Sequence, residues 1–241
     1  TGSATTARSL RTIPAVLERG VRFSAEADSL NAAVLAPSAG PDTAEFGAFC
    51  DAVVGEMVAK AGQKCTAIRR VIVPDTHLDT VSDALVARLE AIPVGHPADD
   101  ATDMGALVGL DQRADVHAAV ASVGARTVFA PELPGLDTER GAFMAPTLLR
   151  AADPASSAAH VVEPFGPVST LLGYQDLEDA VALVAKGRGS LVASVFGPDT
   201  EETARIALGI APFHGRVHTI DATSAAASTG HGSPLPQLVH G

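Results

Sequence analysis

The sequence predicts an α/β fold, an open twisted sheet flanked by helices. Segments with helical periodicity alternate with short apolar segments along the chain, a pattern typical of sheets whose strands are joined by helices. Hydrophobic residues make up 46% of the 241 residues and charged residues 19%, so the chain can bury a core and disorder is excluded. The apolar runs, such as Leu191–Phe196, are too short to cross a bilayer, which takes about 20 residues.

The first third of the chain contains the longest predicted helix. Thr5–Arg19 is expected to be a helix and Val21–Ser24 a strand, and Asn31–Leu35 is a second apolar stretch. A cluster of Pro, Ser, Gly and Asp residues then precedes the helix Thr43–Ala61, which Gly62 ends. Its apolar residues recur at three- and four-residue spacing, which predicts a buried face. They are Phe46, Phe49, Cys50, Val53, Val54, Met57 and Val58.

The rest of the chain continues the alternation. The predicted strands are Arg70–Val73, Arg126–Phe129, Val168–Tyr174, Leu191–Phe196 and Arg216–Ile220. The predicted helices are Leu78–Ala91, Gln112–Ser122, Leu177–Lys186 and Glu201–Leu208. Leu133–Thr147 and the tail Ala222–Gly241 are rich in Gly, Pro or Ser and are expected to be irregular. No repeat or interdomain linker is apparent, so residues 1–241 are expected to form one domain.

The charge excludes two classes of partner. Lys and Arg number 17 against 28 Asp and Glu, a formal net charge of −11. Nucleic-acid binding needs a basic surface, so no nucleic-acid partner is expected. Basic amphipathic segments are missing too, so no membrane partner is expected. The chain opens on Thr1 without a signal-peptide pattern, and we expect it to be a processed or excerpted piece.

The two cysteines, Cys50 and Cys65, have different surroundings. They are too few for a disulfide framework or for zinc sites built from CxxC pairs, so we expect a reducing, cytoplasmic compartment and no metal. Cys50 falls on the apolar face of the long helix and is expected to be buried. Cys65 lies in the short connection between helix and strand, outside that face, so the periodicity does not bury it.

Cys65 is the candidate nucleophile. The GxxxxGK[ST], HExxH and GxSxG motifs are absent, and the eight histidines show no ligand spacing. Lys64 and Arg69 are cationic neighbours that favour a thiolate, and the Cys65 N–H is a candidate oxyanion donor. These residues alone leave two interpretations open: a reactive thiol, or the unreactive cysteine that is commoner in cytoplasmic proteins.

Five short motifs resemble segments of the aldehyde dehydrogenase family, in that family's order. Gly62-Gln63-Lys64-Cys65, followed by Arg69, resembles its active-site segment, and Glu163-Pro164-Phe165-Gly166-Pro167-Val168 resembles its E-x-F-G-P-V motif. Thr1-Gly2-Ser3 resembles the end of its F-T-G-S turn. Weaker matches are Thr102-Asp103-Met104-Gly105 and Phe143-Met144-Ala145-Pro146-Thr147. The resemblance covers essentially the whole chain and implies the fold of that family's C-terminal catalytic domain.

The resemblance implies a mechanism for oxidising an aldehyde. Cys65 would attack the aldehyde and carry the acyl group as a thioester. Glu26 matches the family's general base, which activates the water that hydrolyses the thioester. Most members have E-L-G-G-K here, whereas this chain has Glu26-Ala27-Asp28-Ser29-Leu30-Asn31, without the two glycines. Asp28 and Asn31 are expected to help position Glu26.

The resemblance also implies a nicotinamide cofactor, NADP or NAD, with NADP favoured and no metal. Glu163 resembles the residue that binds the nicotinamide ribose, and Phe165 the residue beside the nicotinamide ring. Gly2 and Ser3 resemble a turn that borders the cofactor, where glycine permits close backbone approach. Gln63 and Arg69 are expected to shape the turn and tether the strand that follows Cys65.

A narrower resemblance predicts the substrate and the parts of the full-length enzyme that the chain is expected to lack. Glu26–Asn31, His231–Pro236 and Val239–Gly241 are similar to family members that oxidise a CoA-linked semialdehyde in phenylacetate degradation, and similar members act in benzoyl-CoA degradation. In the family, the Rossmann-type cofactor-binding half precedes the T-G-S turn. The chain is therefore expected to be the catalytic half alone, without a C-terminal hydratase domain, inactive by itself and at least dimeric in the full-length enzyme.

Three alternatives remain. A CoA-acylating aldehyde dehydrogenase would pass the acyl group to coenzyme A, but such enzymes dispense with the general base that Glu26 supplies. An inactive fragment would serve only subunit association. A Cys-His hydrolase would need a histidine near Cys65, and His214, His218 and His231 are the candidates, without a local signature that supports them.

Overall fold

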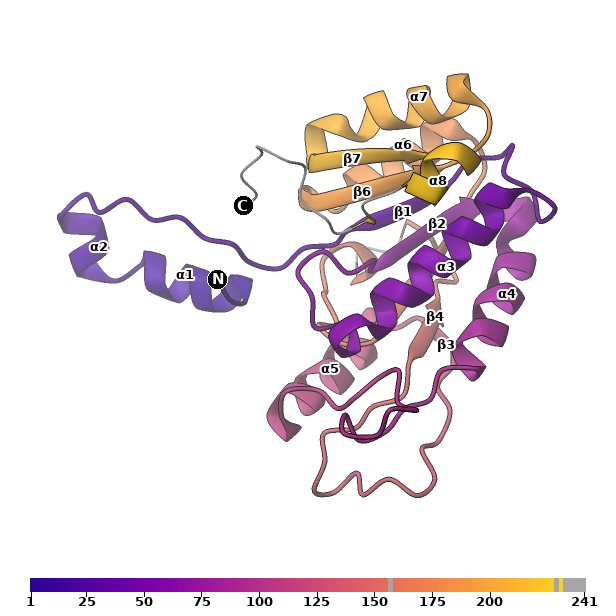
Figure 1. Ribbon diagram of the computed structural model, residues 1–241. Helices are drawn as coiled ribbons and strands as arrows, with labels where there is room; N and C mark the ends of the chain where they lie inside the picture. The colour runs from indigo at the N-terminus through magenta and orange to yellow at the C-terminus, as the bar shows by residue number, and fades with distance from the viewer. Residues whose placement is uncertain (156–157, 228–229, 232–241) are drawn as a thin grey trace.

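The strands of the described chain, residues 1–155, 158–227 and 230–231 of this computed structural model, form one seven-stranded sheet (Figure 1). They are β1 (Ala32–Leu35), β2 (Arg70–Pro74), β3 (Arg126–Phe129), β4 (Thr147–Arg150), β5 (Val168–Tyr174), β6 (Ser190–Phe196) and β7 (His214–Ile220). Their order in the sheet is β3-β4-β5-β2-β1-β6-β7. Only β3 pairs antiparallel to its neighbour, β4, and the other pairs are parallel.

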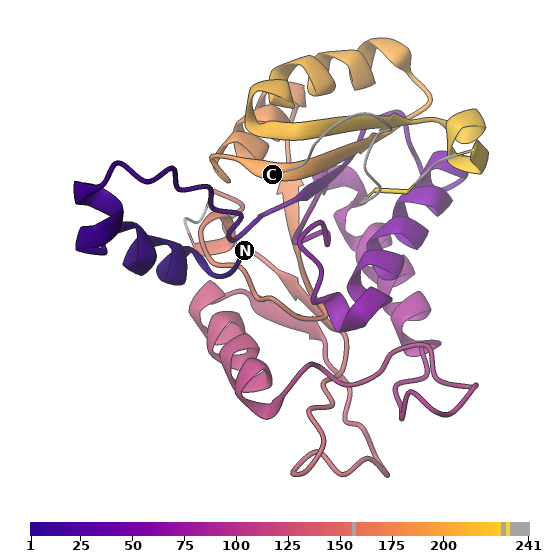
Figure 2. The same ribbon diagram turned by 60° about the vertical axis from the view of Figure 1, so that its left-hand side comes forward.

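Helices cover both faces of the sheet, which confirms the predicted α/β fold. One face packs against α3 (Ala44–Val58), α4 (Leu78–Glu90) and α8 (Ala222–Ala227) (Figure 2). The other face packs against α5 (Leu110–Val123), α6 (Leu177–Ala185) and α7 (Thr200–Ile210). Strand β1 shows why two cores exist: Ala32 and Val34 belong to one, while Ala33 and Leu35 belong to the other. Among the described residues, no helix is long and apolar enough to span a membrane.

Two predicted elements differ from the structure, and one observed strand was missed. Val21–Ser24 is not a strand, because no described strand lies beside it to pair with. The helix predicted over Thr5–Arg19 is split into α1 (Ala4–Arg11) and α2 (Pro14–Glu18), since Pro14 forces Ile13 into an extended conformation. Strand β4 was not predicted.

The predicted irregular tail is partly helical. Residues Ala222–Ala227 form α8, whose Ala225 packs against the same core as α3. The motifs expected over residues 232–236 and 239–241 lie outside the described residues.

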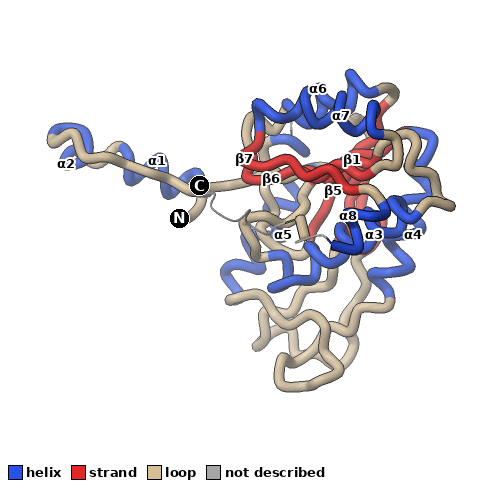
Figure 3. The backbone as a smooth tube through the Cα atoms, turned by 45° about the horizontal axis from the view of Figure 1, so that its top comes forward, coloured by secondary structure: helices blue, strands red, loops and turns tan. Residues whose placement is uncertain are grey.

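The N-terminal segment forms an arm that extends away from the sheet (Figures 1 and 3). Helices α1 and α2 bury no residue, and the apolar side chains of Leu10, Ile13, Leu17 and Val21 are exposed. The arm returns to the body where Gly2 N donates to Glu26 O at 3.0 Å. Both ends of the arm therefore meet at the start of β1.

Candidate active site

The predicted site residues come together because three loops enter adjacent parallel strands. In the sheet, β5, β2 and β1 are neighbours, and their starts are in register at Thr170, Arg70 and Ala32. The segment with Glu26 precedes β1, the turn with Cys65 precedes β2, and Glu163–Gly166 precedes β5. The site consequently lies at the amino ends of these strands, opposite to the carboxyl ends that ligands of open α/β sheets usually occupy.

A cavity of about 670 Å³ opens at this end of the sheet. All six residues predicted to be catalytic or to bind the cofactor line it. The lining consists of Thr1, Gly2, Ser3, Thr6, Glu26, Ala27, Asp28, Cys65, Gln112, Asp115, Val116, Glu163 and Phe165. Gln112, Asp115 and Val116 were not predicted; their spacing puts them on one face of α5, but nothing in the sequence indicates that this face meets the cavity.

The Cys65 thiol is exposed on a tightly constrained turn. After α3 the chain reverses through Lys60, Ala61 and Gly62, which all have positive φ, from 51° to 68°. A β-carbon on Gly62 would lie 2.1 Å from the carbonyl oxygen of Gly166, so only glycine fits here. The turn closes with hydrogen bonds from Lys64 N to Gly62 O and from Ala67 N to Lys64 O, at 2.9 and 3.0 Å.

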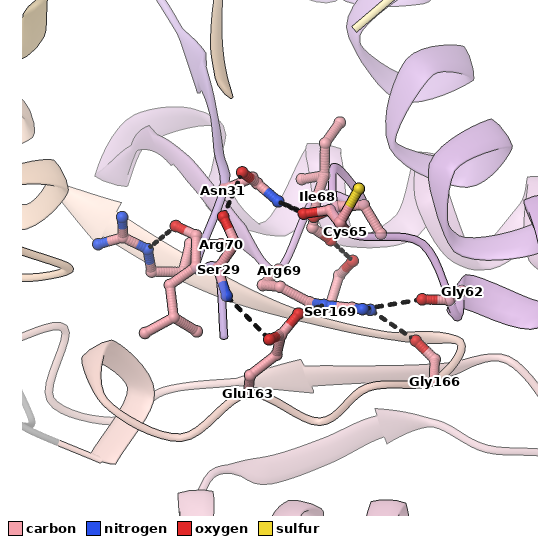
Figure 4. A network of polar contacts seen from close by, with 12 residues as sticks. Ser29, Asn31, Gly62, Cys65, Ile68, Arg69, Arg70, Glu163, Gly166 and Ser169 are labelled. Carbon is pink, nitrogen blue, oxygen red and sulfur yellow. Dashed lines mark hydrogen bonds and ion pairs between the residues drawn. The ribbon is translucent and has the colours of Figure 1, made fainter. Parts of the chain in front are cut away.

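Asn31 holds this turn from the β1 side (Figure 4). Its Nδ2 donates to Cys65 O at 2.8 Å and to Ala67 O at 3.0 Å. Its Oδ1 accepts from Ser29 Oγ at 2.8 Å and from Val192 N at 3.1 Å. Asn31 is completely buried and fully hydrogen-bonded, so it fixes the backbone of Cys65. The sequence associated Asn31 with Glu26, whereas the structure brings it to Cys65.

Glu26 and Asp28 lie where the arm joins the body. The main chain of Glu26 binds Gly2, and Asp28 Oδ1 accepts from Ala4 N, the first residue of α1, at 2.8 Å. Within the described chain, no hydrogen bond engages the Glu26 carboxylate, which is half-buried in the cavity wall. That carboxylate is therefore available to a water molecule in the cavity.

Glu163 is bound on both carboxylate oxygens (Figure 4). Oε1 accepts from Arg69 Nε at 3.1 Å, and Oε2 accepts from Ser29 N at 2.9 Å. Burial raises the pKa of the Glu163 carboxyl, and the charge of Arg69 opposes this rise. Burial likewise lowers the pKa of Arg69, while the charge of Glu163 opposes the fall. The pair is thus a desolvated ion pair whose members each depend on the other.

The two cations that the sequence placed near the thiol are both paired with carboxylates. Lys64 Nζ lies 2.7 Å from Glu56 Oε1, and Arg69 is paired with Glu163. Gln63 joins the turn to the segment before α5, because its Oε1 accepts from Val108 N at 2.8 Å. The charges beside Cys65 are therefore largely balanced within the protein itself.

The remaining groups that could react are the buried thiol of Cys50 and the histidines. Cys50 is fully buried on α3, as predicted, and burial raises its pKa to about 11. Burial lowers the pKa of His231 to about 3, and it also lowers the pKa values of His214 and His218. Among the described residues, no group of three His, Cys, Asp or Glu side chains could hold a metal ion.

A fold and a site of this kind can be compared with known proteins. The model of the aldehyde dehydrogenase family matches residues 1–232, so the chain belongs to that family. It is 42% identical to 3,4-dehydroadipyl-CoA semialdehyde dehydrogenase of Aromatoleum evansii, over 100% of this chain and 48% of that protein. It is also 42% identical to Protein MaoC of Klebsiella aerogenes, over 57% of this chain and 42% of that protein. The chain thus spans about half the length of these relatives.

Solved structures share the fold. Betaine aldehyde dehydrogenase from Staphylococcus aureus, in complex with NAD+, superposes with a TM-score of 0.78 at 24% identity. The superposition covers 91% of this chain and 42% of that one. At this identity the likeness concerns the fold alone, and it confirms the aldehyde dehydrogenase fold that the motifs predicted.

Proposed function

We propose that the protein containing this chain oxidises an aldehyde to a carboxylic acid, with NAD(P)+ as hydride acceptor and Cys65 as nucleophile. One observation carries the proposal: a single cavity gathers an exposed thiol, a half-buried carboxylate to which no described residue hydrogen-bonds, and the Glu163–Phe165 segment. A thiolate suits this reaction because it adds readily to a carbonyl and later leaves readily from a thioester.

The residues divide the chemistry between them. The Cys65 thiolate forms a bond to the aldehyde carbon, and the Cys65 N–H, which the turn does not use, stabilises the resulting oxyanion. NAD(P)+ supplies the acceptor for the hydride that leaves this carbon, and a thioester remains on Cys65. Glu26 then takes a proton from water while the water oxygen bonds to the thioester carbon. The carbon–sulfur bond breaks, so the acid leaves and the thiolate is restored, and Glu26 releases its proton to solvent.

The cavity walls fit the nicotinamide end of the cofactor. Glu163 presents acceptor oxygens suited to ribose hydroxyls, and the Phe165 side chain is 38% exposed beside it. Gly2 leaves open space, since a β-carbon there would meet only Thr6, at 3.9 Å. Ser3 caps α1 and lines the same wall. The preference for NADP over NAD rests on the motif resemblance alone.

The substrate proposal is a CoA-linked semialdehyde from aromatic catabolism. It is supported by the Aromatoleum relative, whose name specifies a CoA-linked semialdehyde and which aligns over the whole chain. The aromatic origin of the substrate is proposed from the motif resemblance. We also propose that residues 1–241 are the catalytic half, that the exposed apolar side chains of the arm pack against the cofactor-binding half, and that the cytoplasmic full-length enzyme is at least dimeric.

Two alternatives make different predictions for the thioester. Transfer to coenzyme A does not need a general base, and Glu26 lining the same cavity as Cys65 favours hydrolysis instead. A Cys-His hydrolase needs an imidazolium beside the thiolate, but the lowered pKa values of His214, His218 and His231 keep these rings neutral.

The proposal is tested in the full-length protein with a CoA-linked semialdehyde and either cofactor. Wild type should yield free acid, Cys65→Ala should lose at least about 1,000-fold in kcat, and Glu26→Gln should accumulate the acyl-enzyme. Cys50→Ala, the matched control, should keep its activity. Wild-type rates in Cys65→Ala would exclude the nucleophile. With free coenzyme A present, a main product that carries a second coenzyme A on the former aldehyde carbon would establish the alternative.

A further inference from the structure

Arg69, the residue before β2, is almost completely buried and joins the two sides of the site (Figure 4). Its three nitrogens donate to Glu163 Oε1 at 3.1 Å, to Gly166 O at 2.7 Å and to Gly62 O at 2.8 Å. Its guanidinium carbon lies 5.4 Å from the centre of the Phe165 ring. One side chain therefore contacts Glu163, Phe165 and Gly166, and also the turn that leads to Cys65.

These contacts meet where two loops touch backbone to backbone. Gly62, three residues before Cys65, packs so closely on Gly166 that there is no room for a β-carbon. Arg69 bonds the carbonyl oxygens of both glycines, so a single planar group fixes their separation. The position of Glu163 and Phe165 relative to the thiol is consequently set by Arg69.

The same contact governs the charge on Glu163. Its side chain is only 5% exposed, yet it lines the cavity, and the bonds from Arg69 and Ser29 leave further lone pairs on both oxygens. Asp28 disfavours the ionised form of Glu163, and Glu26 and Asp115 add negative charge to the cavity wall. Arg69 is the cation that offsets burial and these carboxylates.

We propose that Arg69 is a positioning residue of the cofactor site, which holds Glu163 ionised and Phe165 oriented so that the nicotinamide ribose is bound beside Cys65. The inference rests on the proposed function and adds to it, since Arg69 itself does not line the cavity. A merely structural arginine would stabilise the fold without making cofactor binding depend on pH.

Arg70 provides the matched control. It is as deeply buried as Arg69 and follows it directly, but it donates to Leu30 O at 2.9 Å, to Leu183 O at 3.0 Å and to His160 at 3.2 Å. None of these residues lines the cavity. Substitution of Arg70 thus measures the loss of a buried guanidinium without touching Glu163.

The experiment measures NADPH and NADH binding to the full-length protein by fluorescence titration, with Cys65 alkylation as a readout that needs no cofactor. At pH 7.5, Arg69→Met should weaken binding at least about tenfold, since it leaves a buried carboxylate without its cation. Cofactor binding should recover as the pH rises, because Glu163 without Arg69 has a higher pKa and therefore ionises only at a higher pH than in wild type. Arg69→Lys should restore part of the affinity, and Arg70→Lys should bind as wild type does.

Glu163→Gln keeps Arg69 and its two carbonyl bonds, so it tests the same contact if Arg69→Met fails to fold. It should weaken binding with no dependence on pH, and its effect should not add to that of Arg69→Met. In Glu163→Gln, Arg69 still bonds Gly62 O, so Cys65 should still be alkylated well before Cys50. This inference alone is overturned if Arg69→Met and Arg69→Lys bind the cofactor as wild type does, without dependence on pH. It is also overturned if Arg70→Lys loses as much cofactor affinity as Arg69→Lys. Absence of cofactor binding by wild type overturns the proposed function with it.

Discussion

Cys65 and Cys50 differ in reactivity for reasons that the structure makes specific. The Cys65 side chain is exposed on its turn, whereas Cys50 is 0% exposed and its pKa is raised to about 11 by burial. At pH 8, iodoacetamide should therefore alkylate Cys65 at least about 100-fold faster than Cys50. Peptide mass spectrometry of timed samples measures both rates. In denaturant the two rates should converge, and similar rates in the native protein would contradict the assignment of the exposed thiol.

Asn31 should be more important for stability than its size suggests. Asn31→Ala leaves Cys65 O, Ala67 O and Val192 N without their partners in a buried region. We expect the free energy of unfolding to fall by about 2–4 kcal/mol, as measured by urea denaturation. Asn31→Asp keeps the shape and the acceptor but loses both donors, so it should be destabilised as well. A loss below about 0.5 kcal/mol in both variants would show that these bonds do not hold the turn.

These residues also show how far the sequence could predict the site. Helical periodicity was enough to separate Cys50 from Cys65, because burial on a helix face is a local property. The partnership of Asn31 with Cys65 O spans 34 residues and depends on the pairing of β1 with β2. Such contacts exist only once the sheet has formed, so spacing in the sequence does not reveal them.

At the scale of elements, the junction between α3 and β2 depends on one glycine. Gly62 has φ of 68° and faces Gly166 O, whereas Gly124, which ends α5, has φ of 65° and nothing within 4 Å of its β-carbon position. Both alanine variants incur the left-handed backbone cost of about 1 kcal/mol. Gly62→Ala adds a backbone clash, so it should lose at least about 2 kcal/mol more than Gly124→Ala in denaturant unfolding. Equal losses would mean that the close approach relaxes freely.

The predicted elements succeeded where their stability is local and failed where it depends on partners. The amphipathic α3 and the apolar β5 and β6 were found within a few residues of their observed bounds. Val21–Ser24 has β-forming residues, but a strand requires a neighbour that the described chain does not provide. Strand β4 was missed because Thr147–Arg150 follows a loop rich in Gly and Pro and is too short to show periodicity.

For the whole molecule, the arm and the body have different sources of order. The body buries two apolar cores, whereas α1 and α2 bury nothing and are joined to the body through Gly2, Ala4, Glu26 and Asp28. Three of these four residues line the cavity. A protein surface that packs against α1 and α2 would therefore be connected, through these four residues, to the cavity wall that contains Glu26. The candidate site thus lies at the junction between the part of the chain that buries two apolar cores and the part that buries no residue.

The dependence of stability on acid pH tests the contact between His231 and the strands β6 and β7 at one edge of the sheet. Its Nδ1 lies 2.8 Å from Ser194 Oγ on β6, its carbonyl accepts from Arg216 on β7, and burial lowers its pKa to about 3. The unfolded chain binds a proton at this residue near pH 6.5, whereas the folded chain does not. Stability is therefore complete above pH 6.5 and falls as the pH decreases towards 3, by about 1.4 kcal/mol per pH unit.

The variant His231→Asn separates this effect from other titrations, because an amide oxygen can replace Nδ1 as the acceptor for Ser194 without titrating. Between pH 6.5 and 5, its free energy of unfolding should depend less on pH than that of wild type. The two slopes should differ by at most the slope of one bound proton, about 1.4 kcal/mol per pH unit. His160, His214 and His218 also have pKa values lowered by burial, so part of the slope should persist in the variant. Urea denaturation at half-unit pH intervals measures both slopes. Identical slopes would show that His231 becomes protonated within the fold, and that its contact with β6 and β7 opens before the sheet unfolds.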